Sequence, residues 1–177
     1  MTSHFSSLFI ISPDTQKPQI FYRFLGEYFI CITLFIYAFF IYRTYRLKPK
    51  IEMVPYFVAI LSASVARFGV GSLIRFFYHH PRPFITLSLA HLINDNTYSF
   101  PSGHTIFMFG LATATYFFNK KLAYFLYASG LVIGLARIVG GIHYPSDILG
   151  GIMLGILIGF IVYKLWKRYF SHKTQVL

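Results

Sequence analysis

Five long apolar segments, separated by short polar ones, limit most strongly what this chain can fold into. A bilayer core about 30 Å thick needs roughly 20 apolar residues for each spanning helix. The sequence therefore predicts an all-α integral membrane helical bundle of about five transmembrane helices, in a single domain over residues 1–177. The expected spans are about residues 24–42, 54–73, 102–118, 122–139 and 147–166.

The charged residues agree with a membrane protein. They make up only 12% of the chain, whereas a soluble domain has about a quarter. The formal net charge of +11 does not indicate a nucleic-acid-binding protein, because the Lys and Arg residues lie in short clusters between the apolar segments. The single cysteine, Cys31, lies in an apolar segment and does not reveal the redox compartment.

The two sides of the predicted bundle differ in positive charge. With alternating spans, ten Lys and Arg residues fall on one side and five on the other, while Arg67 lies inside the second span. By the positive-inside rule, the side with ten charges, which includes the C-terminus, faces the cytoplasm. Loops 73–101 and 139–146 then open on the periplasmic or extracellular side of the cell inner (plasma) membrane.

Several shorter features carry expectations of their own. Residues 4–11 form either a short interfacial helix or a flexible terminus. We expect part of the long 75–101 loop, which contains the apolar stretch 84–93, to form a short helix along the membrane surface. We expect Arg67 to pair with Glu27, the alternative being that it lines a substrate channel. Glycines recur every four residues near the C-terminus, which predicts close helix packing within the subunit or in a dimer: Gly151, Gly155 and Gly159.

Three polar clusters lie at span ends on the same side of the predicted bundle. They are Arg75, six intervening residues and Arg82-Pro83; then Pro101-Ser102-Gly103-His104; then Arg137, five intervening residues, His143, three intervening residues and Asp147. Each cluster alone has an ordinary structural explanation. Arginines anchor spans by snorkelling, Ser102 and Asp147 can cap helices, and histidines often lie at membrane interfaces. Because all three clusters, with these internal spacings, fall on the same side of the membrane, a shared site is favoured.

Together the clusters contain the parts of an oxyanion pocket with a nucleophile. Three guanidiniums match the oxygens of a phosphate, and the N-terminus of a helix at Ser102 and Gly103 favours an anion. Two histidines can divide nucleophilic and acid–base work between them, and a carboxylate four residues after one of them can hold its tautomer.

The clusters resemble the motifs of the type-2 phosphatidic acid phosphatase family, which shares its core with vanadium haloperoxidases. The family pattern is Lys, six residues, Arg-Pro; then Pro-Ser-Gly-His; then Ser-Arg, five residues, His, three residues, Asp. This chain matches the second block fully and keeps the spacing of all three. It departs at Arg75, where Lys is usual, and at Ala136, where Ser is usual. The resemblance covers a motif core of about residues 75–147 and the flanking helices.

The resemblance implies a role for each matching residue. His143 attacks phosphorus and forms a phosphohistidine, Asp147 accepts a hydrogen bond from the other ring nitrogen of His143, and His104 protonates the leaving oxygen and then activates water. The implied phosphate-binding residues are Arg75, Arg82, Ser102, Gly103 and Arg137. We expect no metal and no cofactor, because the chain has only five acidic residues and divalent sites need clustered carboxylates.

The implied substrate is a lipid phosphate or diphosphate, because lipid can reach the spans that surround the site. The run from His80 to Phe84 resembles undecaprenyl-diphosphate phosphatases, although these often have Asp in place of Gly103. We expect undecaprenyl diphosphate. The alternative is a broad lipid phosphatase for phosphatidylglycerophosphate, phosphatidate or lipid A. An alternative of another class is a non-catalytic lipid-headgroup binder or transporter, and the oligomeric state is left open.

Overall fold

Helices make up all of the regular structure in the described residues. The computed structural model describes residues 21–86 and 98–174, the last four by backbone alone. No strand occurs in this part of the chain, which confirms the predicted all-α class. The elements are η1 (Phe24–Tyr28), α3 (Phe29–Leu47), η2 (Lys50–Met53), α4 (Val54–Ser64), η3 (Val65–Gly71), α5 (Ser72–Phe77), α6 (Pro83–Thr86), α7 (Gly103–Tyr116), α8 (Lys120–Val139) and α9 (Pro145–Thr174).

Within the described part of the chain, four helical stretches are long and apolar enough to cross a membrane. They are Phe21–Leu47, Lys50–Phe77, Lys120–Val139 and Pro145–Phe170. These stretches correspond to the first, second, fourth and fifth predicted spans, and each is a few residues longer than expected. The protein is therefore a multi-pass membrane protein.

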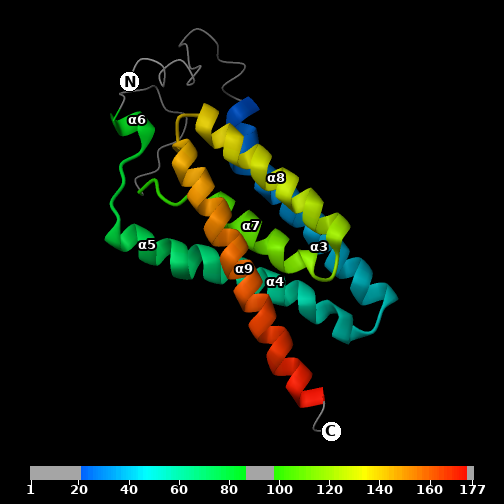
Figure 1. Ribbon diagram of the computed structural model, residues 1–177. Helices are drawn as coiled ribbons and strands as arrows, with labels where there is room; N and C mark the ends of the chain where they lie inside the picture. The colour runs from blue at the N-terminus through cyan, green and yellow to red at the C-terminus, as the bar shows by residue number, and fades with distance from the viewer. Residues whose placement is uncertain (1–20, 87–97, 175–177) are drawn as a thin grey trace.

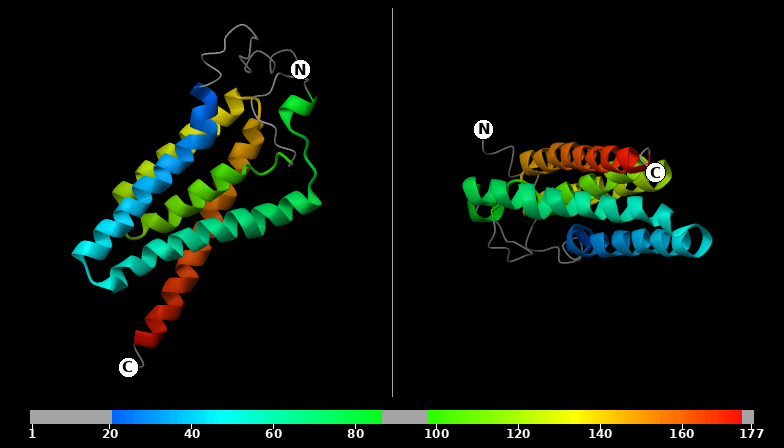
Figure 2. Two further views of the ribbon diagram at one scale, coloured as in Figure 1. Left: turned by 180° about the vertical axis from the view of Figure 1, so that it is seen from behind. Right: turned by 90° about the horizontal axis from the view of Figure 1, so that it is seen from below.

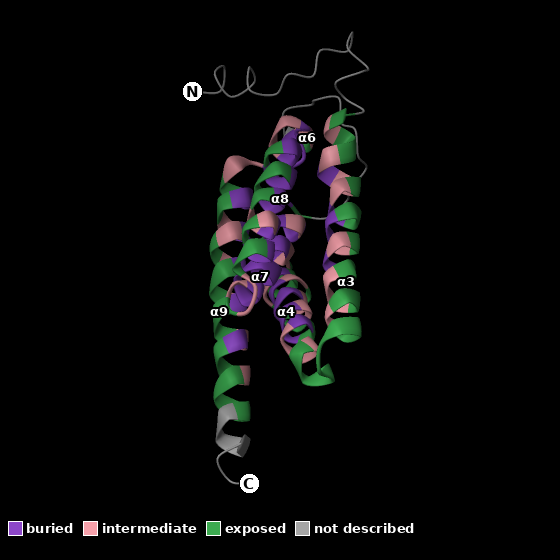
Figure 3. Ribbon diagram, turned by 90° about the vertical axis from the view of Figure 1, so that its right-hand side faces the viewer, coloured by how far each residue is buried: buried purple, intermediate pink, exposed green. Residues whose placement is uncertain are grey.

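The third predicted span is present as α7, but it is shorter than expected. Its 14 residues extend over about 21 Å at 1.5 Å per residue, because Ser102 before the helix has an extended backbone and the helix ends at Tyr116. Eleven of its residues are buried, and Figure 3 shows α7 largely buried while the outer face of α3 is exposed. A helix that is apolar all round and enclosed by other helices does not have to match the bilayer thickness.

The other long helices pack around α7. Helices α4, α8 and α9 all contact it, and α3 packs along α8 (Figures 1 and 2). The end of α8, the beginning of α9 and the short helix α6 gather at one end of the molecule, and α9 ends at the other (Figure 1). This arrangement brings the loops that carry the polar clusters to one end of the bundle.

The glycines of α9 lie against α7, which confirms the prediction of close packing within the subunit. A Cβ at Gly151 would lie 3.1 Å from the carbonyl oxygen of Ser102. A Cβ at Gly155 would lie 2.7 Å from the carbonyl oxygen of Ile106, and a Cβ at Gly159 would lie 2.6 Å from the carbonyl oxygen of Gly110. Side chains there would separate the helices, so these glycines set the distance between α7 and α9.

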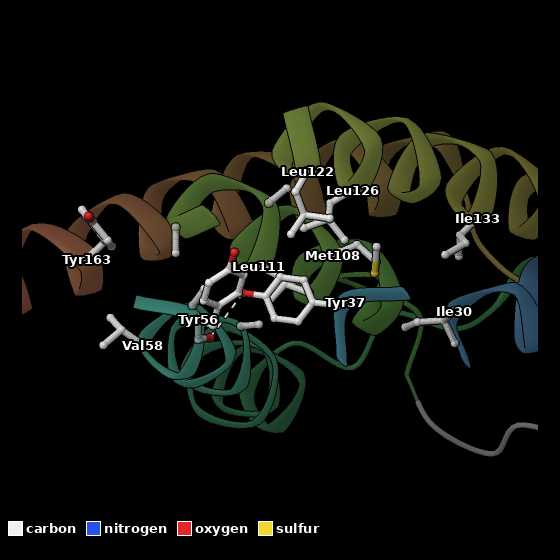
Figure 4. Close-up of a cluster of buried hydrophobic side chains, with 14 residues drawn as sticks. Ile30, Tyr37, Tyr56, Val58, Met108, Leu111, Leu122, Leu126, Ile133 and Tyr163 are labelled. Atoms are coloured by element: carbon white, nitrogen blue, oxygen red, sulfur yellow. Dashed lines mark hydrogen bonds between the residues drawn. The ribbon is translucent and has the colours of Figure 1, made fainter. Parts of the chain in front are cut away.

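The apolar core joins α3, α4, α7, α8 and α9 (Figure 4). Tyr37, which is 2% exposed, lies at its centre beside Tyr56 and Leu111. Its hydroxyl lies 3.3 Å from both the carbonyl oxygen of Tyr56 and the hydroxyl of Thr115, so the polar tip of this side chain is satisfied within the core.

The short helix expected in the 75–101 loop is present as α6, which begins at Pro83. It is described to Thr86, and residues 87–97 of the loop lie outside the described residues. The interfacial helix expected over residues 4–11 also lies outside them.

Candidate active site

The turn after α8 brings His143 back toward Arg137. Gly141 has a φ of 68°, a left-handed conformation that suits glycine. The N–H of Ile142 donates to the carbonyl of Arg137 at 3.0 Å, and that of Gly141 donates to Ile138 at 2.9 Å. This pair of bonds is the Schellman ending of a helix. The N–H of His143 also donates to the carbonyl of Arg137, at 3.3 Å, so the spacing of the third cluster is set by a helix ending.

Asp147 both caps α9 and lies beside His143. One of its carboxylate oxygens, Oδ2, accepts the backbone N–H of Tyr144 at 2.8 Å, which satisfies a donor at the start of the helix. The same oxygen lies 3.5 Å from Nδ1 of His143. The capping explanation and the histidine-orienting one are therefore compatible for this residue, whose side chain is fully buried.

Ser99, which lies outside the three clusters found in the sequence, contacts both His143 and Asp147. Its hydroxyl donates to Oδ2 of Asp147 at 2.5 Å and lies 3.3 Å from Nδ1 of His143. Because the only hydroxyl proton goes to the carboxylate, the Ser99 oxygen is placed to accept from an Nδ1–H of His143. That tautomer leaves Nε2 of His143 without a proton.

The second cluster joins the third through backbone contacts. The N–H of Ser102 donates to the carbonyl of Asp147 at 3.1 Å. The hydroxyl of Ser102 accepts from the hydroxyl of Thr105 at 3.1 Å rather than from a backbone N–H of α7, so it does not cap the helix in the ordinary way. His104 is the second residue of α7 and is half-buried. The start of α7 is thus held against the start of α9.

Two guanidiniums from the second span lie against Gly103. Arg75 Nη2 donates to the carbonyl of Pro101 at 2.8 Å, and Arg67 Nη1 donates to that of Gly103 at 3.3 Å. A Cβ at Gly103 would lie 2.8 Å from Arg75 Nη2 and 3.5 Å from Arg67 Cζ. Glycine therefore permits the close approach of both arginines to the backbone of the second cluster.

The expected Arg67–Glu27 pair is wrong. Glu27 instead faces Arg23 of its own helix, at 3.8 Å, while Arg67 uses a backbone carbonyl at the start of α7. A guanidinium has five donors and can be satisfied by carbonyl oxygens, so an acidic partner is not required.

The remaining two arginines of the site are almost fully buried, each 3% exposed. Arg82 donates to the carbonyl of Ile142 at 3.4 Å, next to His143. Arg137 donates to the carbonyl of Gly26 at 3.1 Å, so the first helix contributes to the site although it lies outside the motif core. The three clusters therefore converge. Arg75 connects the first cluster to the second, Ser102 connects the second cluster to the third, and Arg82 connects the first cluster to the third.

The surroundings of His143 favour its neutral form. Burial lowers the pKa of His143 to about 4, the charges of Arg137 and Arg82 act in the same direction, and Asp147 opposes them. At neutral pH the imidazole is uncharged and can serve as a nucleophile. Within the described residues, no three His, Cys, Asp or Glu side chains lie together as a metal site, and the expectation of metal-independent chemistry remains a prediction.

Several known proteins are similar to this chain in sequence. Undecaprenyl-diphosphatase BcrC of Bacillus subtilis is 37% identical over 101 residues, which cover 56% of this chain and 52% of the relative. Bacitracin transport permease protein BcrC of Bacillus licheniformis is 29% identical over 163 residues, covering 87% of this chain and 75% of the relative. Shorter matches include proteins named phosphatidylglycerophosphatase B, from Bacillus subtilis, and lipid A 4'-phosphatase, from Porphyromonas gingivalis. The chain thus spans about half the length of several curated relatives that it matches.

A solved structure shows the same fold. The crystal structure of Aquifex aeolicus LpxE superposes with a TM-score of 0.68 at 24% sequence identity, covering 92% of this chain and 93% of that one. The family model of the PAP2 superfamily matches residues 52–171, a range that includes all three clusters and every helix from α4 to most of α9. Since that match covers more than half of the chain and contains the convergent site, this chain belongs to the PAP2 superfamily.

Proposed function

We propose that this chain is one membrane domain that hydrolyses a phosphomonoester or diphosphate of a lipid through a phosphohistidine at His143. The observation that supports this most is the contact of buried, neutral His143 with Ser99 and Asp147 beside two buried arginines. The contacts of Nδ1 favour a free Nε2, which is the nitrogen that would attack.

In the first step Nε2 of His143 attacks phosphorus in line, and the bond from phosphorus to the leaving oxygen breaks. His104 gives that oxygen a proton. The imidazole of His143 becomes positively charged, and the carboxylate of Asp147 stabilises this charge through Ser99 and directly. In the second step His104 takes a proton from water, which attacks the phosphohistidine and releases phosphate and the neutral imidazole.

The arginines and the start of α7 would hold the phosphoryl oxygens. Arg75, Arg82 and Arg137 supply fixed positive charge, and backbone contacts already hold each of them in place. The hydroxyl of Ser102 and the N–H of Gly103 lie at a helix N-terminus, where the dipole favours an anion. Donors fixed in advance around a developing negative charge provide much of the rate enhancement in such reactions.

The proposed substrate is undecaprenyl diphosphate. The name of the Bacillus subtilis relative, which is 37% identical over 101 residues, supports it, as does the run from His80 to Phe84. A broad lipid phosphatase is the second candidate, supported by the relatives named phosphatidylglycerophosphatase B and lipid A 4'-phosphatase. The unequal charge of the two ends supports a site that opens outside the cytoplasm, with the C-terminus inside.

A lipid binder or transporter is the alternative of another class, and the name of the Bacillus licheniformis relative, a transport permease, favours it. Headgroup binding requires the arginines but no neutral histidine oriented by a carboxylate. The geometry of His143, Ser99 and Asp147 therefore favours catalysis.

Phosphate release tests the proposal. We expect purified protein to release phosphate from undecaprenyl diphosphate in EDTA, and His143→Ala to abolish release. Comparing kcat/KM for phosphatidylglycerophosphate, phosphatidate and lipid A identifies the preferred lipid. Release that persists in His143→Ala contradicts the mechanism, and headgroup binding without any release supports the alternative class.

A further inference from the structure

The two oxygens of the Asp147 carboxylate have different surroundings. Oδ2 accepts two hydrogen bonds, from Ser99 and from the N–H of Tyr144, and lies beside His143. Oδ1 is buried and has no hydrogen-bond partner among the residues that the structure describes. A buried carboxylate oxygen without a donor is unfavourable, so its surroundings call for explanation.

The ring of His80 faces that oxygen. Nδ1 of His80 lies 3.8 Å from Oδ1 of Asp147, and this nitrogen is also buried and makes no hydrogen bond within the described part of the chain. Two complementary atoms therefore face each other at a distance only about 1 Å longer than a hydrogen bond. His80 lies in the loop before Arg82 and plays no part in the mechanism described above.

Packing holds the ring of His80 in this orientation. It stacks on Tyr78, with centroids 5.6 Å apart and planes 11° apart, and meets the edge of Tyr144 at 5.1 Å. The carbonyl of His80 accepts the N–H of Ser99 at 2.8 Å, so the residue that contacts Oδ1 is tied to one that contacts Oδ2. A cavity of about 370 Å³ lies beside this group, lined by Ile74, Tyr78, His80, Phe100, Ser146 and Asp147.

We propose that His80 is a positioning residue that donates its Nδ1–H to Oδ1 of Asp147 when the site is loaded with substrate. A carboxylate held through one oxygen can rotate about its Cβ–Cγ bond, and a donor at the second oxygen prevents this. The fixed carboxylate then holds His143 in line with phosphorus and stabilises the imidazolium that forms. The role of Asp147 in this inference rests on the proposed function.

The chain offers a matched control in the neighbouring histidine. His79 is exposed and stacks on Tyr98, with centroids 4.3 Å apart. Replacing His79 by Phe keeps an aromatic ring that can stack on Tyr98. His80→Phe keeps the ring stacking and removes the donor, while His80→Asn restores a donor close to the position of Nδ1.

Kinetics separate positioning from packing. We expect His80→Phe to lower kcat about 10- to 100-fold, the usual effect of losing a hydrogen bond to a charged group, with KM little changed. His80→Asn should recover most of kcat, and His79→Phe should match the wild type. In an Asp147→Asn background, His80→Phe should lower kcat little further, because the interaction between residues 80 and 147 has already been changed. The inference is overturned if His80→Phe leaves kcat unchanged, or if the effects of His80→Phe and Asp147→Asn on kcat are fully independent.

A spectroscopic measurement does not depend on turnover. In protein labelled with 15N-histidine, bound to vanadate as a phosphate mimic, the Nδ1–H resonance of His80 should shift on Asp147→Asn while that of His79 does not. If His80→Phe is fully active while His143→Ala is inactive, this inference fails and the proposed function stands. If the wild type releases no phosphate, the proposed function fails. The His80 resonance still decides whether His80 donates to Asp147, and a resonance that does not shift on Asp147→Asn overturns that contact.

Discussion

Both ends of this bundle carry clustered cationic residues, but they hold them in opposite ways. At the site end, Arg82 and Arg137 are 3% exposed and donate to backbone carbonyls. At the other end, Lys48 is exposed and pairs with the exposed Glu52, and Lys164 lies over the ring of Phe160. The buried guanidiniums are fixed before any ligand arrives, whereas the exposed ammoniums can move.

Residue type alone therefore does not distinguish a buried cation that is hydrogen-bonded in place from an exposed cation that can move. A cation that sets membrane orientation needs only to lie on the correct side of the membrane. A cation that stabilises a transition state must already be in place, so that no reorganisation is needed during the reaction. Replacing one cation at each end of the bundle tests this difference.

Removing a buried guanidinium should have the largest effect. We expect Arg137→Ala to lower kcat/KM about 10²- to 10³-fold, because a fixed donor to the phosphoryl oxygens is lost. Arg46→Ala at the other end should leave kcat/KM unchanged within about twofold, since exposed charges act weakly. Phosphate release from the same lipid substrate measures both. Equal losses would remove the distinction between the two ends.

Acid should destabilise the site end. The pKa of His143 is lowered to about 4, whereas an unfolded histidine has a pKa near 6.5, so the unfolded state binds a proton first as pH falls. Its contribution to stability is present above about pH 6.5 and is lost progressively toward pH 4. The full shift corresponds to about 3 kcal/mol.

Thermal unfolding in detergent between pH 7 and pH 4 checks this expectation. The non-titrating variant His143→Gln should lose less stability than the wild type across that interval. An identical pH dependence of the two proteins would show that His143 is not held neutral by its surroundings.

Removing the Ser99 hydroxyl should have an intermediate effect. We expect Ser99→Ala to lower kcat about 10- to 100-fold, because Asp147 loses a hydrogen bond and Nδ1 of His143 loses an acceptor. Ser62→Ala is a matched control, since that hydroxyl donates to the carbonyl of Val58 within its own helix. Wild-type kcat in Ser99→Ala would mean that direct contact with Asp147 is sufficient to orient His143.

The smallest expected effect concerns the packing of α7 against α9. In Gly155→Ala, the added Cβ would lie 2.7 Å from the carbonyl oxygen of Ile106. Separating α7 from α9 should then destabilise the protein by about 1–3 kcal/mol. Gly69→Ala is the control, because its nearest neighbour would be a side-chain carbon at 3.9 Å. Thermal unfolding compares them, and equal Tm values would argue against the proposed role of the glycines.

Apolar length and motif spacing predicted much of this molecule. Four of the five expected spans follow directly from apolar length. The spacing inside the third cluster follows from two helix ends: the interval from Arg137 to His143 is the Schellman ending of α8 around Gly141, and Asp147 follows as the cap of α9. Such local rules can be read from the chain.

Contacts between distant residues could not be predicted in the same way. Ser99 resembles any polar residue in a loop until the fold places it against Asp147. The carbonyl of Gly26, which accepts from Arg137, has no signature in sequence because every residue has a carbonyl. For the same reason the expected partner of Arg67 was Glu27, whereas Arg67 donates to the carbonyl of Gly103. The short length of α7 depends on its enclosure by neighbouring helices, which apolar length does not reveal.

Trapping the covalent intermediate tests the central claim most directly. Protein mixed with undecaprenyl diphosphate labelled with 32P at the terminal phosphate, then quenched in alkali within milliseconds, should carry an acid-labile, base-stable label. Proteolysis should place that label on the peptide that contains His143, and His143→Ala should carry none. Phosphate release without any labelled protein, or a label on another residue, would contradict the account.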